Sequence, residues 1–213
     1  MICGVDEAGK GSVLGPMVVA AVGARSADVF SDIGVKDSKQ LTPAERERLF
    51  PLIKKRCKVA VVIIPAEEID AIRREMTMNA CVARAHAQAI QKLAPDTAYV
   101  DACDVNPFRY AETVKSHLDI ACEIVSEHHA DDTYPIVSAA SIIAKVTRDR
   151  EITKLAKKYG EIGSGYPSDP ITIAYLSAYI DQHKSPPPIA RKSWKTVSTM
   201  MGKKSQSSLS AFI

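Results

Sequence analysis

The chain has 213 residues, of which 46% are hydrophobic and 25% are charged, and its five cysteines are scattered without a CxxC pair. This length and composition are typical of a globular protein with one full hydrophobic core, and they argue against a disulfide scaffold or a zinc knuckle. Because the formal net charge is only +3, any nucleic-acid site must come from local clusters of Lys and Arg rather than from a generally basic surface.

Short β-branched runs and amphipathic stretches alternate along the chain. In chain order they predict strands at 2–5 and 17–24, a helix at 43–56, a strand at 59–64, a helix at 78–93, a strand at 97–100, a helix around 108–117, a strand at 120–126, and helices at 135–160 and 171–180. Thr42 as N-cap with Pro43 at the first helical position marks the start of the first helix. This order predicts an α/β sheet with antiparallel strands first and βαβ crossovers behind, followed from about Gly163 by a small separate unit.

Acidic residues stand at the ends of predicted strands. Asp6 and Glu7 close the first strand, Asp101 closes a later one, and Asp131 with Asp132 precedes the long helix. Carboxylates that meet along one sheet edge repel one another unless cations bind, and hard oxygen ligands favour Mg²⁺ or Mn²⁺. Two such ions would suit metal-assisted phosphodiester displacement. Taken singly, each acid can instead be a turn former or a helix cap, and Asp132 fits best as a cap.

Five blocks of the chain carry a family resemblance. In order, they read GVDEAGKGSVLGPMVVAAV, VKDSKQL, AYVDACDV, ADDTYPIVSAASIIAKVTRDR and GSGYPSDP. They closely resemble consecutive blocks of the type 2 ribonuclease H (ribonuclease HII) family, in the family's order and up to about residue 170, with an archaeal character. The resemblance implies a ribonuclease H-like mixed five-stranded sheet flanked by helices, with a small C-terminal helical extension. We therefore expect a catalytic domain at 1–165, a helical subdomain at 166–200 and a flexible tail at 201–213.

By this resemblance, Asp6, Glu7, Asp101 and Asp131 are the catalytic and metal-binding acids, because they fall in the family's DEAGKG, YVD and AD blocks. The first three would hold two Mg²⁺ or Mn²⁺ ions on the scissile phosphate, and Asp131 would help to complete the second site and position the attacking water. The implied activity is endonucleolytic cleavage of the RNA strand of RNA/DNA hybrids, or of a single ribonucleotide in duplex DNA, leaving 3′-hydroxyl and 5′-phosphate ends. His129 stands where similar proteins often have Lys. This difference removes no metal ligand, but the position lacks a fixed positive charge.

Recognition of one ribonucleotide requires groups that sense its 2′-hydroxyl. Glycines permit unusual backbone angles and close approach, so the peptide groups of Gly9, Lys10 and Gly11 can contact the sugar while Lys10 neutralises a phosphate. The resemblance assigns this stretch that role, together with Tyr166, whose ring would pack against the sugar. Taken singly, an ordinary tight turn and an amphipathic loop residue are the simpler interpretations.

Basic and hydroxyl residues supply candidates for contacts with phosphates. Ser138, Ser141, Lys145 and Arg148 form one polar stripe on the long helix beside the fourth acid, which would bind phosphates unless it is merely a solvated face. The matching blocks add five further candidates, which are Ser38, Lys39, Lys192, Trp194 and Lys195. Trp194 can equally dock the tail onto the main domain.

The last eight residues, QSSLSAFI, match the spacing of a sliding-clamp-binding peptide. The anchor positions are Gln206, Leu209 and Phe212, with Ile213 in place of the usual second aromatic residue. Such peptides insert a short apolar plug after a disordered linker. A functionless terminus is the alternative.

Two other functions fit parts of the sequence. Residues 4–10 satisfy the P-loop pattern GxxxxGK of nucleotide-binding ATPases, but Gly11 replaces the required Ser or Thr, two acids lie inside the loop, and a strand is expected after it. A non-catalytic nucleic-acid-binding clamp accessory is opposed by the acids, since carboxylates without metals weaken phosphate binding. No basic leader and no apolar run long enough for a bilayer is present, so we expect a cytoplasmic monomer without a membrane anchor. The five histidines, His86, His117, His128, His129 and His183, lack metal spacing, and we expect surface or capping roles.

Overall fold

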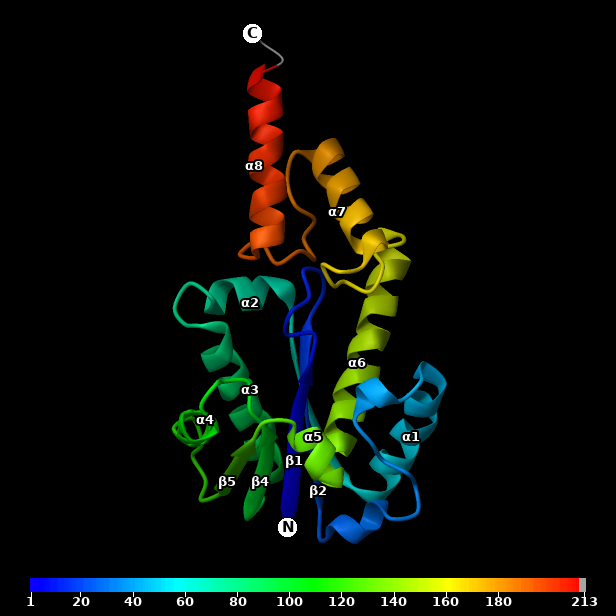
Figure 1. Cartoon of the computed structure of the whole chain (residues 1–213), viewed down its shortest axis with the longest axis vertical. Coiled ribbons are helices and arrows are strands. Elements are labelled where there is room, and N and C mark those ends of the chain that lie inside the picture. The colour runs from blue at the N-terminus through cyan, green and yellow to red at the C-terminus, as the bar shows by residue number, and fades with distance from the viewer. Residues whose placement is uncertain (211–213) are drawn as a thin grey trace. The chain divides into compact units, whose positions relative to one another are not determined.

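Figure 1 shows the computed structural model, which describes residues 1–210 and the side chains of residues 1–202. Its centre is one five-stranded mixed sheet in the order β3-β2-β1-β4-β5. The antiparallel pair β1 and β2 comes first, and β1–β4 and β4–β5 are parallel. The strands are β1 (Ile2–Ala8), β2 (Met17–Ala24), β3 (Lys58–Ile64), β4 (Thr97–Asp101) and β5 (Glu123–Glu127). The predicted mixed α/β sheet is thus confirmed.

Helices alternate with these strands along the chain and continue after the last strand. They are α1 (Pro43–Arg56), α2 (Ala66–Ile72), α3 (Met78–Leu93), α4 (Pro107–Lys115), α5 (Ala130–Thr133), α6 (Pro135–Tyr159), α7 (Pro170–His183) and α8 (Lys195–Ser210), with short 3₁₀ turns at Ala27–Phe30 and Ser38–Gln40. The predicted start of α1 is confirmed, since the Thr42 hydroxyl accepts from the Glu45 N–H at 3.3 Å and the Glu45 carboxylate accepts from the Thr42 N–H at 2.7 Å. Helices α2 and α5 were not predicted, because both are too short to show a period.

The chain folds into two compact units. The first comprises Met1–Ala8, Val18–Ile63 and Thr77–Arg148. The second comprises Gly9–Met17, Ile64–Met76 and the chain from Asp149 onward, so it includes two early segments that a division at residue 165 leaves in the first domain. Among the described residues, no helix has the length and apolar character needed to cross a membrane, and the five cysteines form no disulfide with one another.

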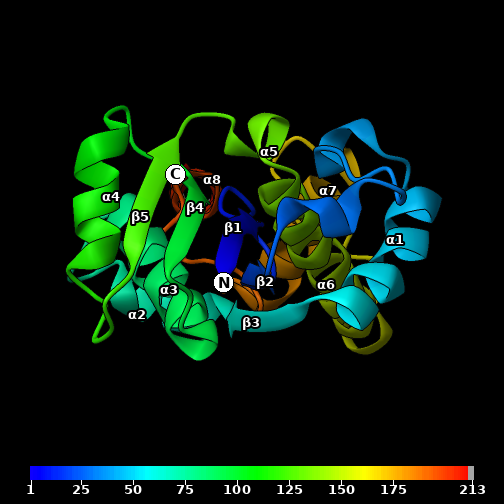
Figure 2. The same ribbon diagram turned by 90° about the horizontal axis from the view of Figure 1, so that it is seen from below.

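In the first unit the sheet is covered on both faces. Alternate residues of β2, among them Val18, Ala20 and Val22, pack into a core with α6 and α1, while α3 packs against β1 and α4 on the other side. Figure 2 shows these two helical groups on opposite sides of β1. At Gly4 a Cβ would lie 2.3 Å from the Ile136 backbone, so the glycine allows β1 and α6 to approach closely.

The second unit has its own apolar core. It consists of Val13, Leu14, Ile152, Ile162, Leu176, Ile180, Ile189, Ala190 and Val197. The backbone N–H of Val13 donates to Gly165 at 2.8 Å, and the N–H of Arg191 donates to Val13 at 2.9 Å. Residues 9–17 are therefore fixed to the loop at 163–169 and to the segment before α8.

Candidate active site

Four of the predicted acids lie at one end of the sheet in the first unit. Strand β1 extends beyond the predicted end at Val5, because Asp6 and Glu7 pair with Ala20 and Val19 of β2. Successive side chains of a strand point to opposite faces, so these two neighbours meet different helices. Asp101 is the last residue of β4, the parallel neighbour of β1, and Asp131 lies in α5 just after β5.

Asp6 points toward α6 and is only 6% exposed. Its carboxylate accepts from the Glu7 N–H at 2.7 Å and from the Ser141 hydroxyl. Ser141 in turn lies 2.7 Å from the Ser38 hydroxyl, so Ser38 can donate to Ser141 while Ser141 donates to Asp6. Burial, followed by the charge of Glu7, raises the pKa of Asp6 well above its usual value. A buried carboxylate among like charges favours a bound cation.

Asp101 accepts a hydrogen bond from the Ala130 N–H at 3.1 Å, which joins the end of β4 to the start of α5. Partial burial raises the pKa of Asp101, and the charges of Asp131 and Glu7 act in the same direction.

Asp131 is buried and lies beside a lysine. The Lys39 ammonium is 3.3 Å from the Asp131 carboxylate and 3.7 Å from that of Asp37. Partial burial acts to lower the pKa of Lys39, but the charges of Asp131 and Asp37 outweigh it and raise that pKa. The Ser138 hydroxyl donates to the Asp131 carbonyl at 2.5 Å, which ties α5 to α6.

Glu7 points to the opposite face, where it meets a buried histidine. His86 of α3 is 0% exposed, and its Nε2 lies 3.0 Å from the Glu7 carboxylate. The expectation of a surface or capping role is therefore wrong for His86. Its place on the apolar side of α3, beside the buried Val82 and Ala85, was the signal that marked it as an inward-facing residue.

The predicted polar stripe of α6 is not a solvated face. Ser138, Ser141 and Arg148 are buried, and Lys145 is half-buried. The Ser138 hydroxyl binds the Asp131 carbonyl and the Ser141 hydroxyl binds Asp6, so in this structure both serines support the acids. Helical periodicity could not show this, because a hydroxyl that supports a carboxylate and one that faces solvent occupy equivalent helix positions.

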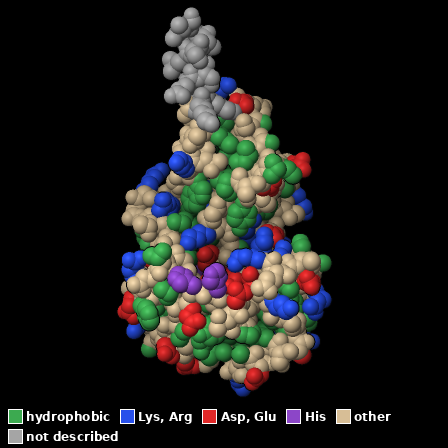
Figure 3. Space-filling model, in the orientation of Figure 1, with side chains coloured by type: hydrophobic (Ala, Val, Ile, Leu, Met, Phe, Trp, Pro, Cys, Tyr) green, Lys and Arg blue, Asp and Glu red, His purple; other side chains and the backbone are tan. Residues whose placement is uncertain are grey.

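Asp132 and His129 flank the buried Asp131 on the surface. Asp132 lies inside α5, exposed, and accepts from the Gln40 amide at 3.0 Å. His129 precedes α5 with φ of 57°. Ligand atoms of His129, Asp131 and Asp132 lie within 4.8 Å of one another, close enough to contact a single cation. On one face of the molecule, Figure 3 shows histidine side chains next to acidic and basic ones.

The predicted ribose-sensing loop lies in the second unit. Gly9 has φ of 86°, as expected for a position that requires glycine. Gly11 does not have a positive φ; it is exposed, and a Cβ at this position would meet open space. Arg191 was not predicted to take part in the site. It is 0% exposed and donates to the carbonyls of Gly9 at 2.6 Å and Lys10 at 2.8 Å. The loop conformation is therefore fixed by a buried guanidinium.

Other predicted contact residues of this unit lie around the same segments. Tyr166 is half-buried in the loop whose Gly165 carbonyl binds Val13 and Leu14. Lys192 and Lys195 are exposed, and the Asp70 carboxylate accepts from the Lys192 N–H at 2.7 Å. Trp194 packs against the apolar core and under the Arg191 guanidinium at 4.9 Å, which favours its docking role.

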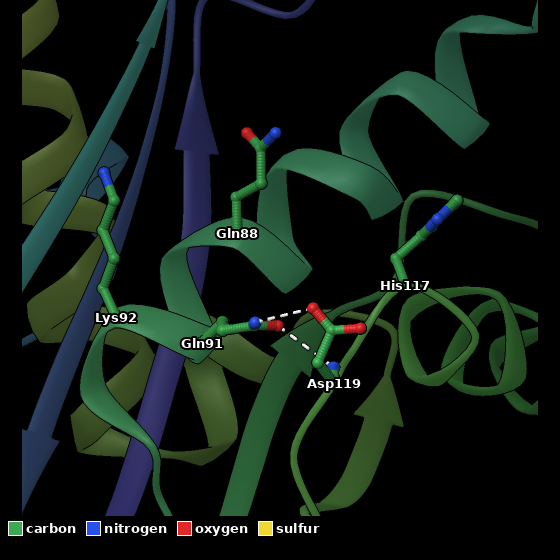
Figure 4. A pocket seen from close by; sticks show the side chains of 5 residues that line it. All are labelled: Gln88, Gln91, Lys92, His117 and Asp119. Carbon is green, nitrogen blue, oxygen red and sulfur yellow. Dashed lines mark hydrogen bonds between the residues drawn. The ribbon is translucent and has the colours of Figure 1, made fainter.

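The first unit also has a polar pocket, and none of the four candidate acids lines it. Gln88, Gln91 and Lys92 of α3 line it with His117 and Asp119 (Figure 4). The Gln91 side chain and Asp119 exchange two hydrogen bonds, of 2.9 and 3.1 Å, so the lining groups bind one another.

The P-loop alternative has no support in the fold. Asp6 and Glu7 are part of β1 itself, and β2 rather than a helix follows the glycine loop. A phosphate-binding helix N-terminus is therefore lacking at this place in the described chain. The predicted clamp-binding residues Gln206, Leu209, Phe212 and Ile213 fall outside the part whose side chains are described.

Comparisons with known proteins agree on one family. The family model described as Ribonuclease HII matches residues 3–197. Ribonuclease HII of Methanoregula boonei is 76% identical over 212 residues, and that of Methanospirillum hungatei is 58% identical, each alignment covering 100% of both chains. The crystal structure of ribonuclease H2 from Pyrococcus horikoshii has a TM-score of 0.87 at 45% identity, covering 95% of this chain and 97% of that one.

Two further structures extend the comparison. The PCNA:RNase HII complex from Archaeoglobus fulgidus gives a TM-score of 0.86 at 42% identity, covering 92% of this chain and 95% of that one. Bst-RNase HIII in complex with Mn²⁺ gives a TM-score of 0.75 at 21% identity, covering 96% of this chain and 70% of that one. This similarity concerns the fold alone. With a family model spanning nearly the whole chain and relatives aligned from end to end, the protein belongs to the ribonuclease HII family.

Proposed function

We propose that this metal-dependent ribonuclease H, whose family acts on RNA/DNA hybrids, also nicks duplex DNA at a single embedded ribonucleotide, and that it uses two divalent cations to do so. The observation that carries the proposal is the gathering of Asp6, Glu7, Asp101 and Asp131 at one end of the sheet, with raised pKa values at Asp6 and Asp101. Burial of carboxylates beside other negative charges is costly without a cation, and carboxylates offer only hard oxygen ligands.

The chain's own groups fit a site for Mg²⁺ or Mn²⁺. Asp6, Glu7 and Asp101 would supply ligand oxygens from two neighbouring strands, and Asp131 would complete the second position. When bound, the two ions would stabilise charge on the attacking and leaving oxygens of the phosphodiester. Ser141 and the Ala130 N–H hold the carboxylates of Asp6 and Asp101 in place, so little reorganisation is needed on binding.

Hydrolysis then needs a water aimed at phosphorus. Asp131 would accept a hydrogen bond from this water, and Lys39, 3.3 Å from the same carboxylate, would offset part of the phosphate charge. Water adds to phosphorus and the bond to the 3′-oxygen breaks, so the products carry 3′-hydroxyl and 5′-phosphate ends.

Selection of a ribonucleotide would come from the loop at Gly9–Gly11 with Tyr166. Open space at Gly11 leaves its peptide accessible to a sugar, and the Arg191 contacts fix the peptides before it. A 2′-hydroxyl both donates and accepts, so it matches backbone groups that a deoxyribose leaves unpaired. The exposed Lys192 and Lys195 would bind backbone phosphates of the duplex.

A labelled duplex with one ribonucleotide, incubated with Mg²⁺ or Mn²⁺, tests the activity. We expect one nick on the 5′ side of the ribonucleotide, lost in Asp101→Asn while duplex binding is preserved. Asp104→Asn is the matched control, because Asp104 lies three residues further on and pairs with Arg109 at the surface. An intact duplex with the wild-type enzyme would refute the proposed substrate, and full cleavage by Asp101→Asn would refute the role of Asp101.

We also propose that the C-terminal peptide binds a sliding clamp. The peptide spacing of Gln206, Leu209 and Phe212 supports this, as does the relative from Archaeoglobus fulgidus whose complex with PCNA is known. Binding of the full chain to an immobilised archaeal clamp should be lost in a chain ending at Gly202 and in Phe212→Ala. Equal binding by the shortened chain would contradict the assignment.

A further inference from the structure

A buried side-chain pair lies behind Glu7 on the α3 face of the sheet. His86 places Nε2 at 3.0 Å from the Glu7 carboxylate and Nδ1 at 3.1 Å from the Tyr110 hydroxyl of α4. Both side chains are nearly inaccessible, at 0% and 1% exposure. Their rings meet edge to face, with centroids 5.8 Å apart and an angle of 87°. Glu7, His86 and Tyr110 thus form a chain of contacts from three different elements.

The hydrogen positions in the Glu7–His86–Tyr110 contacts follow from which groups can only accept. A carboxylate only accepts, so Nε2 of His86 must carry the proton that faces Glu7. In a neutral ring Nδ1 is then an acceptor, and the Tyr110 hydroxyl donates to it. Burial raises the pKa of Tyr110 well above its usual value, so this hydroxyl retains its proton. Each polar group in the chain then has a partner of the opposite kind.

Glu7 is the acid that most needs such a restraint. Its side chain has one more rotatable bond than those of Asp6, Asp101 and Asp131, so more conformational entropy is lost when it is fixed. Asp6 and Asp101 are held by Ser141 and the Ala130 N–H, but both of those groups come from the side of α5 and α6. The α3 face offers His86 instead.

We propose that His86 and Tyr110 are positioning residues for metal binding, which orient the Glu7 carboxylate toward a divalent cation through the hydrogen bond between His86 and Glu7. This inference rests on the proposed role of Glu7 as a ligand. Groups that orient metal ligands through a hydrogen bond commonly change metal affinity by about 10–100-fold when removed.

Mn²⁺ binding to the protein without nucleic acid, measured by calorimetry and by the loss of the free-ion electron paramagnetic resonance signal, provides the test. His86→Leu is expected to weaken Mn²⁺ binding by about 10–100-fold, and Tyr110→Phe to weaken it less, because only the support of His86 is lost. His86→Gln keeps an N–H donor and should recover most of the affinity. Tyr175→Phe is the matched control: Tyr175 lies in the second unit, and no hydrogen-bond partner of its hydroxyl is present among the described residues.

Cleavage assays separate positioning from substrate binding. The Mn²⁺ concentration for half-maximal rate should rise in His86→Leu, while KM for the duplex at saturating Mn²⁺ stays at the wild-type value. In a Glu7→Gln background, His86→Leu should cause no further loss of Mn²⁺ affinity, because the interaction that it removes is already gone.

The possible results are distinct. If the variants melt at lower temperature but bind Mn²⁺ as the wild type does, His86 and Tyr110 serve the core only and the inference is wrong. If His86→Gln binds as weakly as His86→Leu, the hydrogen bond is not the cause and the inference is equally wrong. Absence of Mn²⁺ binding in the wild type itself would instead refute the proposed metal site.

Discussion

Replacement of Arg191 by Met is expected to lower the free energy of unfolding by about 3 kcal/mol. The buried guanidinium donates to the carbonyls of Gly9, Lys10 and Gly15, at 2.6, 2.8 and 3.2 Å. Hydrogen bonds from a charged donor contribute roughly 1.5 kcal/mol each at the low end, or about 4.5 kcal/mol together. Methionine no longer buries a charge, and the Gly9 carbonyl keeps the Ser12 hydroxyl as donor at 2.8 Å, which reduces the net loss.

The same substitution should slow cleavage beyond its effect on stability. Loss of the guanidinium releases the peptides of Gly9 and Lys10, and a displacement of about 1 Å in a positioning group can cost about 10²-fold in rate. We therefore expect kcat/KM on the single-ribonucleotide duplex to fall by about 10²-fold at a temperature where the variant is fully folded. The kcat/KM of Arg191→Lys should lie between those of the wild type and Arg191→Met, because one ammonium group cannot bind all three carbonyls.

Urea unfolding followed by circular dichroism, with cleavage rates on the same preparations, measures both effects. Arg25→Met makes the same chemical change at an exposed residue and should shift the unfolding free energy by less than about 0.5 kcal/mol. An Arg191→Met variant with wild-type unfolding would refute the energetic reasoning. A destabilised variant that cleaves at the wild-type rate would show that the guanidinium supports the second unit but not the loop's function.

Three further predictions concern the acids and the loop. Because burial and neighbouring charges raise the pKa of Asp6 and Asp101 in the folded protein, the folded state binds more protons than the unfolded one, so metal-free stability should fall as pH rises from the ordinary carboxyl range through the raised values. Asp6→Asn should therefore raise the metal-free melting temperature at about pH 7.5, lose this advantage at about pH 4, and abolish the stabilisation by Mn²⁺, as differential scanning calorimetry can check. Asp131→Asn should reduce the cleavage rate by about 10²-fold or more while Asp132→Asn, at the exposed neighbour, leaves it nearly unchanged, and equal losses would refute the assignment of the fourth acid. Gly11→Ala should unfold as the wild type does, because the Cβ meets open space, but bind the single-ribonucleotide duplex about tenfold more weakly, equivalent to ~1.4 kcal/mol; unchanged affinity measured by fluorescence anisotropy would argue against close sugar contact there.

Local signals were enough for most elements of the fold. The Thr42–Pro43 helix start and the acid at the end of β4 were both predicted, because capping and strand patterns depend on neighbouring residues. The extension of β1 through Asp6 and Glu7 was not, since it depends on pairing with β2. Short helices such as α2 lack the length that a periodic pattern requires.

The four acids that the fold brings to one end of the sheet were selected from sequence, but the contacts that support them and the nearby loop were not. Arg191 binds carbonyls more than 170 positions earlier in the chain, and no local pattern marks such a contact. Ser141 was selected as a candidate for phosphate contact, and only the packing of α6 against the sheet reveals that its hydroxyl supports Asp6. His86 is the exception, because its place on the apolar side of α3 could have been read in advance.

The adjacent acids of β1 are hydrogen-bonded by helices on opposite faces of the sheet. Asp6 is bound by Ser141 of α6, and Glu7 is bound by His86 of α3. Changes behind the sheet can therefore tune one carboxylate without disturbing the packing that serves the other. If these carboxylates hold cations as proposed, substitutions in α6 and in α3 offer two separate ways to alter the metal site.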